Sequence, residues 1–542
     1  MSAKYWKAAL AMASVLAATV PTAETATATA AAAATTTAAA TATAATTATA
    51  AAAAAATTTA TAATAAPAAA VSGRTAPDRA GPRPPGPTPP PGGGGGEAWS
   101  WTQLTGQGTR IRYVSTDTSH SCPTVRYTYG GVRAGHQLQT VSTPSGTKFP
   151  TTVCEVGVPL TASDAVLDAS TVHAAAVHPG NLRLPLPEWT ATTRPTRIAV
   201  VGDTGCSVPG SGPVQDCADH QNGWPFARIA TSIVGRTRPD LVIHVGDFLY
   251  REDPGRENDK PANPGCTTSA DAAGWACVVA DFFRPAETLL AAAPLALTRG
   301  NHEDCNTAHT GGAGGAFYRY LADQLRSDGK CVDYPDPVVI DAGALGLVAL
   351  DSAFADPKDS GSTAGQSIYT RQFETVNQAA RHNPARDYFL FTHKPLWAVR
   401  STATTPPTWW THVLAGAVAG TNLGRLADNV RLVLSGHIHL YQMIDFNTRR
   451  PPQLTVGSSG GTLEHGPDDS KAVGTPIGVP PQPVHQSVTQ EQAGTGGLGV
   501  FGFADLRYGG GAWSVAFRNR NGDVRGRTCT LSGSLTQKSF SC

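Results

Sequence analysis

Five short polar segments of this chain place metal-binding residue types directly after apolar runs. They are Gly202-Asp203-Thr204-Gly205, Gly246-Asp247-Phe248-Leu249-Tyr250, Gly300-Asn301-His302-Glu303, Thr392-His393 and Gly436-His437-Ile438-His439. Asp, Asn, His and Tyr offer oxygen and nitrogen donors without thiolate sulfur, and such a donor set suits iron, zinc or manganese. The segments therefore predict a metal site and not a redox cysteine cluster.

The apolar runs before these segments predict buried strands. They are Ile198 to Val201, Leu241 to Val245, Leu295 to Leu297, Phe389 to Phe391 and Leu432 to Leu434. In an open α/β sheet, ligands bind just beyond the carboxyl ends of the strands. One Gly-Asp or Asn-His pair is common at a strand end, but five such ends in order predict that the polar residues share one crevice.

The chain from Thr196 onward alternates strand patterns with helical patterns, which predicts an α/β layered fold. Apolar residues recur at helical spacing between Phe226 and Val234 and again between Phe282 and Leu290. Near the end of the chain, the apolar stretch Ala512 to Phe517 is followed by Asn521-Gly522, which predicts a hairpin. Both helical stripes are more typical of core than of a binding surface.

The part of the chain before Thr196 divides into three regions of different composition. Residues 1–23 carry Lys4 and Lys7 before an apolar run from Ala8 to Val20, which predicts a secretory signal peptide. That run is short for a membrane span, so an anchor would require the signal to stay uncleaved. Residues 24–96 are rich in Ala and Thr and then in Pro and Gly, and we interpret them as a disordered spacer.

The length of residues 97–542 predicts two domains, because a chain of this length is more than one hydrophobic core usually supports. Residues 97–193 contain short alternating strands and predict a small antiparallel β domain, and residues 194–542 form the larger α/β domain with its terminal hairpin. The chain has 41 Lys plus Arg and 40 Asp plus Glu, without a basic run, so no nucleic-acid-binding surface is evident.

Ten cysteines behind a predicted signal peptide favour disulfide bonds over thiolate metal ligands. Sequential pairing is the simplest expectation, although other connectivities remain open. It joins Cys122 with Cys154, Cys206 with Cys217, Cys266 with Cys277, Cys305 with Cys331, and Cys529 with Cys542. Three of these bonds would stiffen loops beside the metal motifs.

At the five polar segments the sequence resembles the calcineurin-like metallophosphoesterase superfamily and, within it, the purple acid phosphatases. The family pattern is Gly-Asp-x-Gly, Gly-Asp-x-x-Tyr, Gly-Asn-His followed by an acid, Val-x-x-His, and Gly-His-x-His, in that order. The first, second, third and fifth elements match fully. In the fourth, Val-x-x-His, Leu390 stands where the family has Val, but His393 is present. The resemblance covers roughly residues 196 to 460. It implies a layered β-sandwich flanked by helices.

The resemblance also implies roles for individual residues. Asp203, Tyr250 and His439 would hold one metal, Asn301, His393 and His437 a second, and Asp247 would bridge them. Two such cations lower the pKa of a shared water, so that a bridging hydroxide becomes the nucleophile. His302 follows a ligand without being one, which leaves its imidazole free to protonate the leaving group. A phenolate ligand favours iron in the first site, with zinc, manganese or iron in the second.

These residues predict a secreted dinuclear metal-dependent phosphoester hydrolase, most simply an acid phosphatase acting on phosphomonoesters. A phosphodiesterase or nucleotidase on the same scaffold is the alternative, and a stalked, non-catalytic surface protein is a further one. Arg299, Asp304, His309 and His465 are weaker candidates for substrate contact, and His244 is expected in the core. The physiological substrate and the oligomeric state do not follow from the sequence.

Overall fold

The computed structural model describes residues 95–259, 266–305, 313–328, 330–355, 363–400, 408–409, 412–492 and 497–542. The predicted signal peptide and all but the last two residues of the predicted spacer lie outside these ranges. Within them, no helix combines the length and apolar character that a membrane crossing requires.

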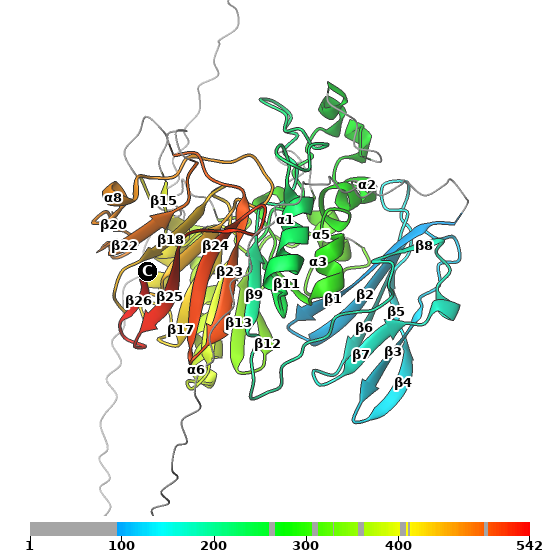
Figure 1. Ribbon diagram of the computed structural model, residues 1–542, viewed down its shortest axis with the longest axis horizontal. Helices are drawn as coiled ribbons and strands as arrows, with labels where there is room; N and C mark the ends of the chain where they lie inside the picture. The colour runs from blue at the N-terminus through cyan, green and yellow to red at the C-terminus, as the bar shows by residue number, and fades with distance from the viewer. Residues whose placement is uncertain are drawn as a thin grey trace, which may run out of the picture. The chain divides into compact units, whose positions relative to one another are not determined.

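Two large sheets make up the described fold (Figure 1). The first has twelve strands in the described ranges, and its first eleven are paired in the order β26 (Lys538–Ser541), β25 (Val524–Gly533), β24 (Ala512–Asn519), β23 (Gly502–Gly509), β9 (Arg197–Val201), β10 (Leu241–His244), β11 (Leu295–Leu297), β1 (Glu97–Thr105), β2 (Gly108–Ser115), β6 (Thr152–Val158) and β5 (Gln139–Ser142). The twelfth, β8 (Ala176–His178), pairs with β1. β9, β10 and β11 run parallel, so their carboxyl ends lie at one edge.

The second sheet has seven described strands. Their order is β12 (Val338–Ala342), β13 (Leu345–Leu350), β14 (Asp387–Thr392), β17 (Val430–Ser435), β19 (Gln453–Val456), β18 (Tyr441–Asp445) and β22 (Gln486–Thr489). β13, β14, β17 and β19 are parallel neighbours. The predicted strands around Phe389 to Phe391 and Leu432 to Leu434 are therefore confirmed as adjacent strands.

The two sheets face each other across a shared apolar core. Ile198, Val200 and Ile243 of the first sheet belong to the same buried cluster as Phe389 and Leu432 of the second. The alternate residues of β14 and β17 point the other way and pack against two helices, α6 (Thr363–His382) and α7 (His412–Ala419). The predicted α/β layered sandwich flanked by helices is thereby confirmed.

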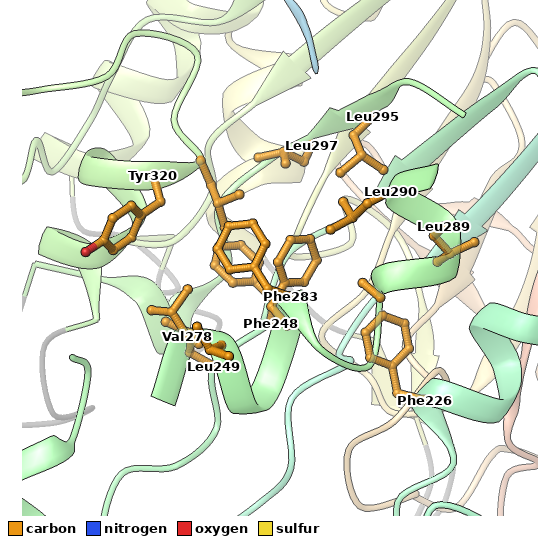
Figure 2. Close-up of a cluster of buried hydrophobic side chains, with 14 of the residues drawn as sticks. Phe226, Phe248, Leu249, Val278, Phe283, Leu289, Leu290, Leu295, Leu297 and Tyr320 are labelled. Carbon is orange, nitrogen blue, oxygen red and sulfur yellow. The ribbon is translucent and has the colours of Figure 1, made fainter. Parts of the chain in front are cut away.

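The outer face of the first sheet is covered by a second group of helices. They are α1 (Phe226–Ser232), α2 (Trp275–Val278), α3 (Glu287–Ala292) and α5 (Gly314–Tyr320). Figure 1 shows α1, α3 and α5 beside β9 and β11, and Figure 2 shows Phe226, Phe283 and Leu290 in the apolar cluster that they form over the sheet. Both predicted helical stripes are therefore core, as expected.

The two helical stripes are not regular helices throughout. After α1 the chain continues as a π-helical turn, Ile233–Thr237, and a second π-helical turn, Val279–Phe283, follows α2 directly. A π-turn carries one extra residue and re-aims the side chains that follow it, which periodicity in the sequence does not reveal.

The amino-terminal strands build a smaller antiparallel sheet, β4 (Val132–Gln137), β3 (Thr124–Tyr129) and β7 (Ser163–Leu167), that packs on β1, β2 and β6. The small antiparallel β region is thus present. However, β1 also pairs in parallel with β11, through Gln103 and Leu295, so the first sheet runs on from one predicted domain into the other. The domain boundary at residue 193 stays a prediction.

The predicted hairpin and disulfide bonds are both present. β24 and β25 pair antiparallel around Gly522, whose φ of 81° lies in the left-handed region that glycine tolerates. Five disulfides join Cys122–Cys154, Cys206–Cys217, Cys266–Cys277, Cys305–Cys331 and Cys529–Cys542. The sequential pairing is therefore confirmed. The remaining described strands and α-helices are short: β15 (Val399–Arg400), β16 (Thr408–Trp409), β20 (Pro476–Ile477), β21 (Gln482–Pro483) and α8 (Asp469–Ala472).

Candidate metal centre

The carboxyl ends of β9, β10, β11, β14 and β17 converge, although they come from two different sheets. Backbone hydrogen bonds join the turns that follow them: the N–H of Asp203 donates to the carbonyl of Gly246 at 2.9 Å, and the N–H of Gly436 donates to the carbonyl of His393 at 2.8 Å. Between the two sheets, the N–H of His437 donates to Oδ2 of Asp203 at 3.0 Å, so the strand ends that the sequence predicted to meet are brought together.

Three of the predicted ligands form one tight group. The hydroxyl of Tyr250 lies 2.9 Å from Oδ1 of Asp203 and 2.8 Å from Nε2 of His439, and these last two atoms are 3.2 Å apart. The Nδ1 of His439 is 2.5 Å from the carbonyl of Thr462, which orients Nε2 toward the group. The side chains predicted for the first metal are thus brought together.

The other predicted ligands form a second group beside the first. Nε2 of His393 lies 3.1 Å from Oδ1 of Asn301, and ligand atoms of Asp247, His393 and His437 all fall within 4.8 Å of one another. Nδ1 of His393 lies 2.9 Å from the carbonyl of Val245. As at His439, a backbone acceptor on one ring nitrogen leaves the other nitrogen facing the group.

Asp247 belongs to both groups. Its Oδ2 lies 2.8 Å from the hydroxyl of Tyr250 and 3.0 Å from Nε2 of His393. Its Oδ1 accepts the backbone N–H of His302 at 2.9 Å, which holds the carboxylate in its place between the two groups. This arrangement is the one that a bridging carboxylate requires.

Three of the clustered residues have a backbone conformation that is unusual for side-chain-bearing residues. The φ angles of Asp203, Asp247 and His437 are 55°, 56° and 70°. Residues held in the left-handed region cluster at functional sites, where the surrounding structure stabilises them. A Cβ on Gly300 would overlap the Asp247 carboxylate, and one on Gly436 would overlap that of Asp203. The backbone at these two glycines therefore lies too close to the carboxylates to leave room for a side chain.

His302 lies at the edge of the cluster, next to Tyr250. The two rings have centroids 4.2 Å apart, and Nδ1 of His302 lies 2.9 Å from Oε1 of Glu252. Burial alone lowers the pKa of His302, but the carboxylates of Asp247 and Glu252 outweigh burial and raise it above its ordinary value. Sequence reasoning did not single out Glu252, whose only signal was its place two residues after Tyr250.

Glu303 is a second functional residue that the sequence analysis left without a role. Its buried carboxylate accepts backbone N–H groups from the Asp247 turn and from Gly300, at 2.9 to 3.2 Å. Burial, and then the nearby Asp247, raise the pKa of Glu303 to about 8. The acid that follows Gly-Asn-His thus supports the turn that presents Asp247.

His244 is buried in β10, as expected, but it also links two of the motifs. Its Nδ1 lies 3.2 Å from the N–H of Gly246, and its Nε2 lies 2.9 Å from the hydroxyl of Thr204. Because burial, and then His393, lower the pKa of His244 to about 3, the ring is neutral. Nδ1 therefore accepts from Gly246, and the Nε2 hydrogen is donated to Thr204.

Among the weaker candidates for substrate contact, Arg299 has other partners. Arg299 is buried, and its guanidinium is occupied by Asp351 at 2.7 Å and by the carbonyls of Val332 and Asp333. It is therefore a structural residue. His309 lies outside the described residues.

The charges within the cluster favour a cation. Burial raises the pKa of Tyr250, and the carboxylates of Asp203 and Asp247 raise it further, well above its ordinary value. Burial by itself lowers the pKa of His393, but Asp247 raises it to about 9. Two buried carboxylates need a compensating positive charge; in the metal-free protein a proton on His393 supplies part of it, and a bound cation would take the place of that proton. The donor set and its geometry therefore fit a pair of metal ions.

Residues 196–441 match the model of the calcineurin-like phosphoesterase family. These residues therefore form a calcineurin-like phosphoesterase domain, and this domain is a metal-dependent phosphoester hydrolase. No curated protein matches the chain.

Solved structures similar to this chain include three from different sources. A purple acid phosphatase from yellow lupin (Lupinus luteus) seeds is 13% identical, covers 80% of this chain and 74% of its own, and has a TM-score of 0.46. A conserved uncharacterized protein, a predicted phosphoesterase, from Streptococcus pneumoniae is 10% identical over 63% of this chain and 100% of its own, with a TM-score of 0.24. Vps29 from Chaetomium thermophilum is 10% identical over 64% of this chain and 96% of its own, with a TM-score of 0.22.

Proposed function

We propose that this protein is a secreted, dinuclear phosphomonoesterase of the acid phosphatase type. Asp203, Tyr250 and His439 would hold the first metal, and a second set of residues, Asn301, His393 and His437, would hold the other. The observation that carries the proposal is the shared carboxylate: Oδ2 of Asp247 is in contact with the hydroxyl of Tyr250 on one side and with Nε2 of His393 on the other.

The bound metals would lower the pKa of a shared water and neutralise phosphate oxygens as charge shifts in the transition state. The side chains of this protein hold the two groups of ligands in place and position the proton donor. Asp247 holds the two groups together, and Glu303 fixes the turn that presents it. His302, paired with Glu252, supplies a proton to the leaving alkoxide.

Iron in the first position, with zinc, manganese or iron in the second, follows from the hardness of a phenolate ligand. Secretion is supported by five disulfide bonds, which form and persist in oxidising compartments. It is also supported by the amino-terminal segment that has the composition of a signal peptide.

The test is a parallel assay of one phosphomonoester, one phosphodiester and one nucleotide, with metal content measured on the same samples. Faster hydrolysis of the monoester by protein that carries two metals per chain is the expected result. Preference for the diester or the nucleotide would identify a phosphodiesterase or nucleotidase instead. A metal-loaded protein that hydrolyses none of them would favour a non-catalytic surface protein.

A further inference from the structure

A buried ion pair lies directly behind Tyr250. Nε of Arg251 is 2.5 Å from Oδ1 of Asp281, and both side chains are fully buried, at 0% exposed. Removing two charges from water is expensive, and an apolar pair of similar volume is often at least as stable. The pair therefore needs an explanation other than general stability of the fold.

The contacts of Asp281 point to the metal centre. Its Oδ2 accepts the backbone N–H of Tyr250 at 3.1 Å, so the carboxylate holds the residue that carries the phenol. Its Oδ1, which faces Arg251, is 3.5 Å from the N–H of Cys206, the residue directly after the Gly-Asp-x-Gly turn. One carboxylate thus contacts the last residue of the Gly-Asp-x-x-Tyr turn and the residue that follows the Gly-Asp-x-Gly turn.

Arg251 reaches the same two turns from the other side. Its guanidinium lies 5.5 Å from the ring centre of Trp224, and the indole N–H of Trp224 donates to the carbonyl of Thr204 at 2.8 Å. The backbone at Arg251 forms a parallel bridge with Val208, which follows the first turn. Arg251 therefore connects Tyr250 to the segment that presents Asp203.

The position of Asp281 depends on the π-helical turn Val279–Phe283. On this turn Asp281 faces Tyr250, while its neighbour Phe283 lies in the apolar cluster with Phe248 and Leu249 (Figure 2). The Gly-Asp-x-x-Tyr turn is thus anchored by two apolar side chains in the cluster and by one carboxylate at its last residue. A π-turn at such a place is typical of functional sites.

We propose that Arg251 and Asp281 are a positioning pair that holds the Tyr250 phenol at the first metal. The inference rests on the proposed assignment of Tyr250 as a ligand. Residues that orient a metal ligand from behind typically change metal affinity or activity by about 10- to 100-fold when they are replaced. The pair contacts the backbone of the ligand and its neighbouring turn, so its loss should displace the phenol without removing any ligand.

The decisive variant is the double replacement Arg251→Met with Asp281→Leu. It removes both charges and the acceptor for the Tyr250 N–H but keeps the volume filled. The matched control is Arg112→Met with Glu155→Leu, a pair 2.8 Å apart whose arginine is also fully buried and makes its other hydrogen bonds to Gln103 and Asp323. Each protein is loaded with iron and compared with the wild type.

Three quantities are measured: the thermal midpoint of the metal-free protein, the rate of metal loss to a chelator, and the visible absorption of the iron-loaded protein. For the double variant we expect a midpoint close to that of the wild type, metal loss about tenfold faster, and a shifted or weakened band. The control variant should keep the wild-type band and rate. A folded double variant with the wild-type band and rate of metal loss would overturn the inference.

A second variant keeps the test valid if the double variant does not fold. Asp281→Asn keeps the shape of the side chain but removes its charge, and it should change the band and the rate in the same direction by a smaller amount. A folded Asp281→Asn protein identical to the wild type in both would contradict the inference. An iron-loaded wild type without a band contradicts the ligand assignment itself, whereas an intact wild-type band that survives in the double variant contradicts the positioning pair alone.

Discussion

Oδ2 of Asp247 lies 3.0 Å from Nε2 of His393, although the two residues follow strands of different sheets, β10 and β14. The contact joins the carboxyl end of a strand in the twelve-stranded sheet to that of a strand in the seven-stranded sheet. The candidate metal centre is therefore a feature of the sandwich as a whole and not of either sheet, and Asp247 is the residue that contacts both groups of candidate ligands.

Replacement of the shared carboxylate should empty both metal positions. We expect Asp247→Ala to lose both metals and essentially all hydrolysis, because each cation loses a ligand and their mutual repulsion is less screened. Elemental analysis and turnover measure this. Asp341→Ala removes an exposed carboxylate paired with Arg386 and should keep two metals. Two metals per chain and near-normal turnover in Asp247→Ala would contradict the bridging role.

Loss of the proposed general acid should depend on the leaving group. We expect His302→Ala to cost roughly 10²- to 10⁴-fold with poor leaving groups, the usual range for such catalysis, and less with good ones, while metal content is unchanged. Glu252→Gln, which removes the charge facing His302, should give a smaller loss in the same direction. Equal losses across the leaving-group series would show that His302 only positions the substrate or supports the site.

Visible absorption of the iron-loaded protein should depend on Tyr250. A phenolate bound to ferric iron gives a charge-transfer band in the visible, so the iron-loaded protein should be coloured. Tyr250→Phe should lose the band while the remaining ligands still bind metal. Spectra and iron content measured on the same samples test this. An iron-loaded wild type without the band would leave Tyr250 as a packed aromatic residue.

The glycine before Asn301 should tolerate no side chain. We expect Gly300→Ala to release metal and reduce activity strongly, because the added methyl group would occupy the space of the Asp247 carboxylate. The control is Gly235→Ala, where an added Cβ meets no atom within 4 Å. Metal content and the unfolding midpoint distinguish the two. Normal metal binding in Gly300→Ala would mean that the turn can shift to make room.

A buried lysine outside the metal centre should make stability depend on pH. Burial lowers the pKa of Lys538 to about 7, and its ammonium donates to the carbonyl of Arg449 at 2.7 Å. Between pH 7 and the ordinary lysine pKa of about 10.4, the unfolded chain binds the proton and the folded chain does not, so the free energy of unfolding rises with pH. Below pH 7 both states are protonated and this contribution no longer changes.

Lys538→Met should therefore flatten the rise in unfolding free energy between pH 7 and 10. Urea unfolding at pH 7 and pH 9.5 measures it in both proteins. Lys330→Met, which removes an ammonium whose side chain is 78% exposed, serves as the control. The same rise in Lys538→Met as in the wild type would show that other groups cause the pH dependence.

The sequence alone was enough to predict the chemistry proposed for this protein, because the types of the candidate ligands and the order of the strand ends are local properties. Asp203, Asp247, Asn301, His393 and the two histidines at 437 and 439 could be identified as one set from short motifs behind apolar runs. Sequential disulfide pairing was the simplest expectation for ten cysteines, although other connectivities stayed open. Alternating strand and helix patterns predicted an α/β layered fold, and the family resemblance implied the sandwich.

Only the tertiary structure decided what holds those ligands in place. The contacts of Glu303 with the Asp247 turn, and of Asp281 with Tyr250, join segments 31 to 56 residues apart in the chain. They depend on a π-helical turn and on left-handed backbone angles that residue patterns do not encode. The pairing of β1 with β11 likewise joins residues far apart in the chain, because sheet edges pair wherever packing brings them together and not where the sequence is contiguous.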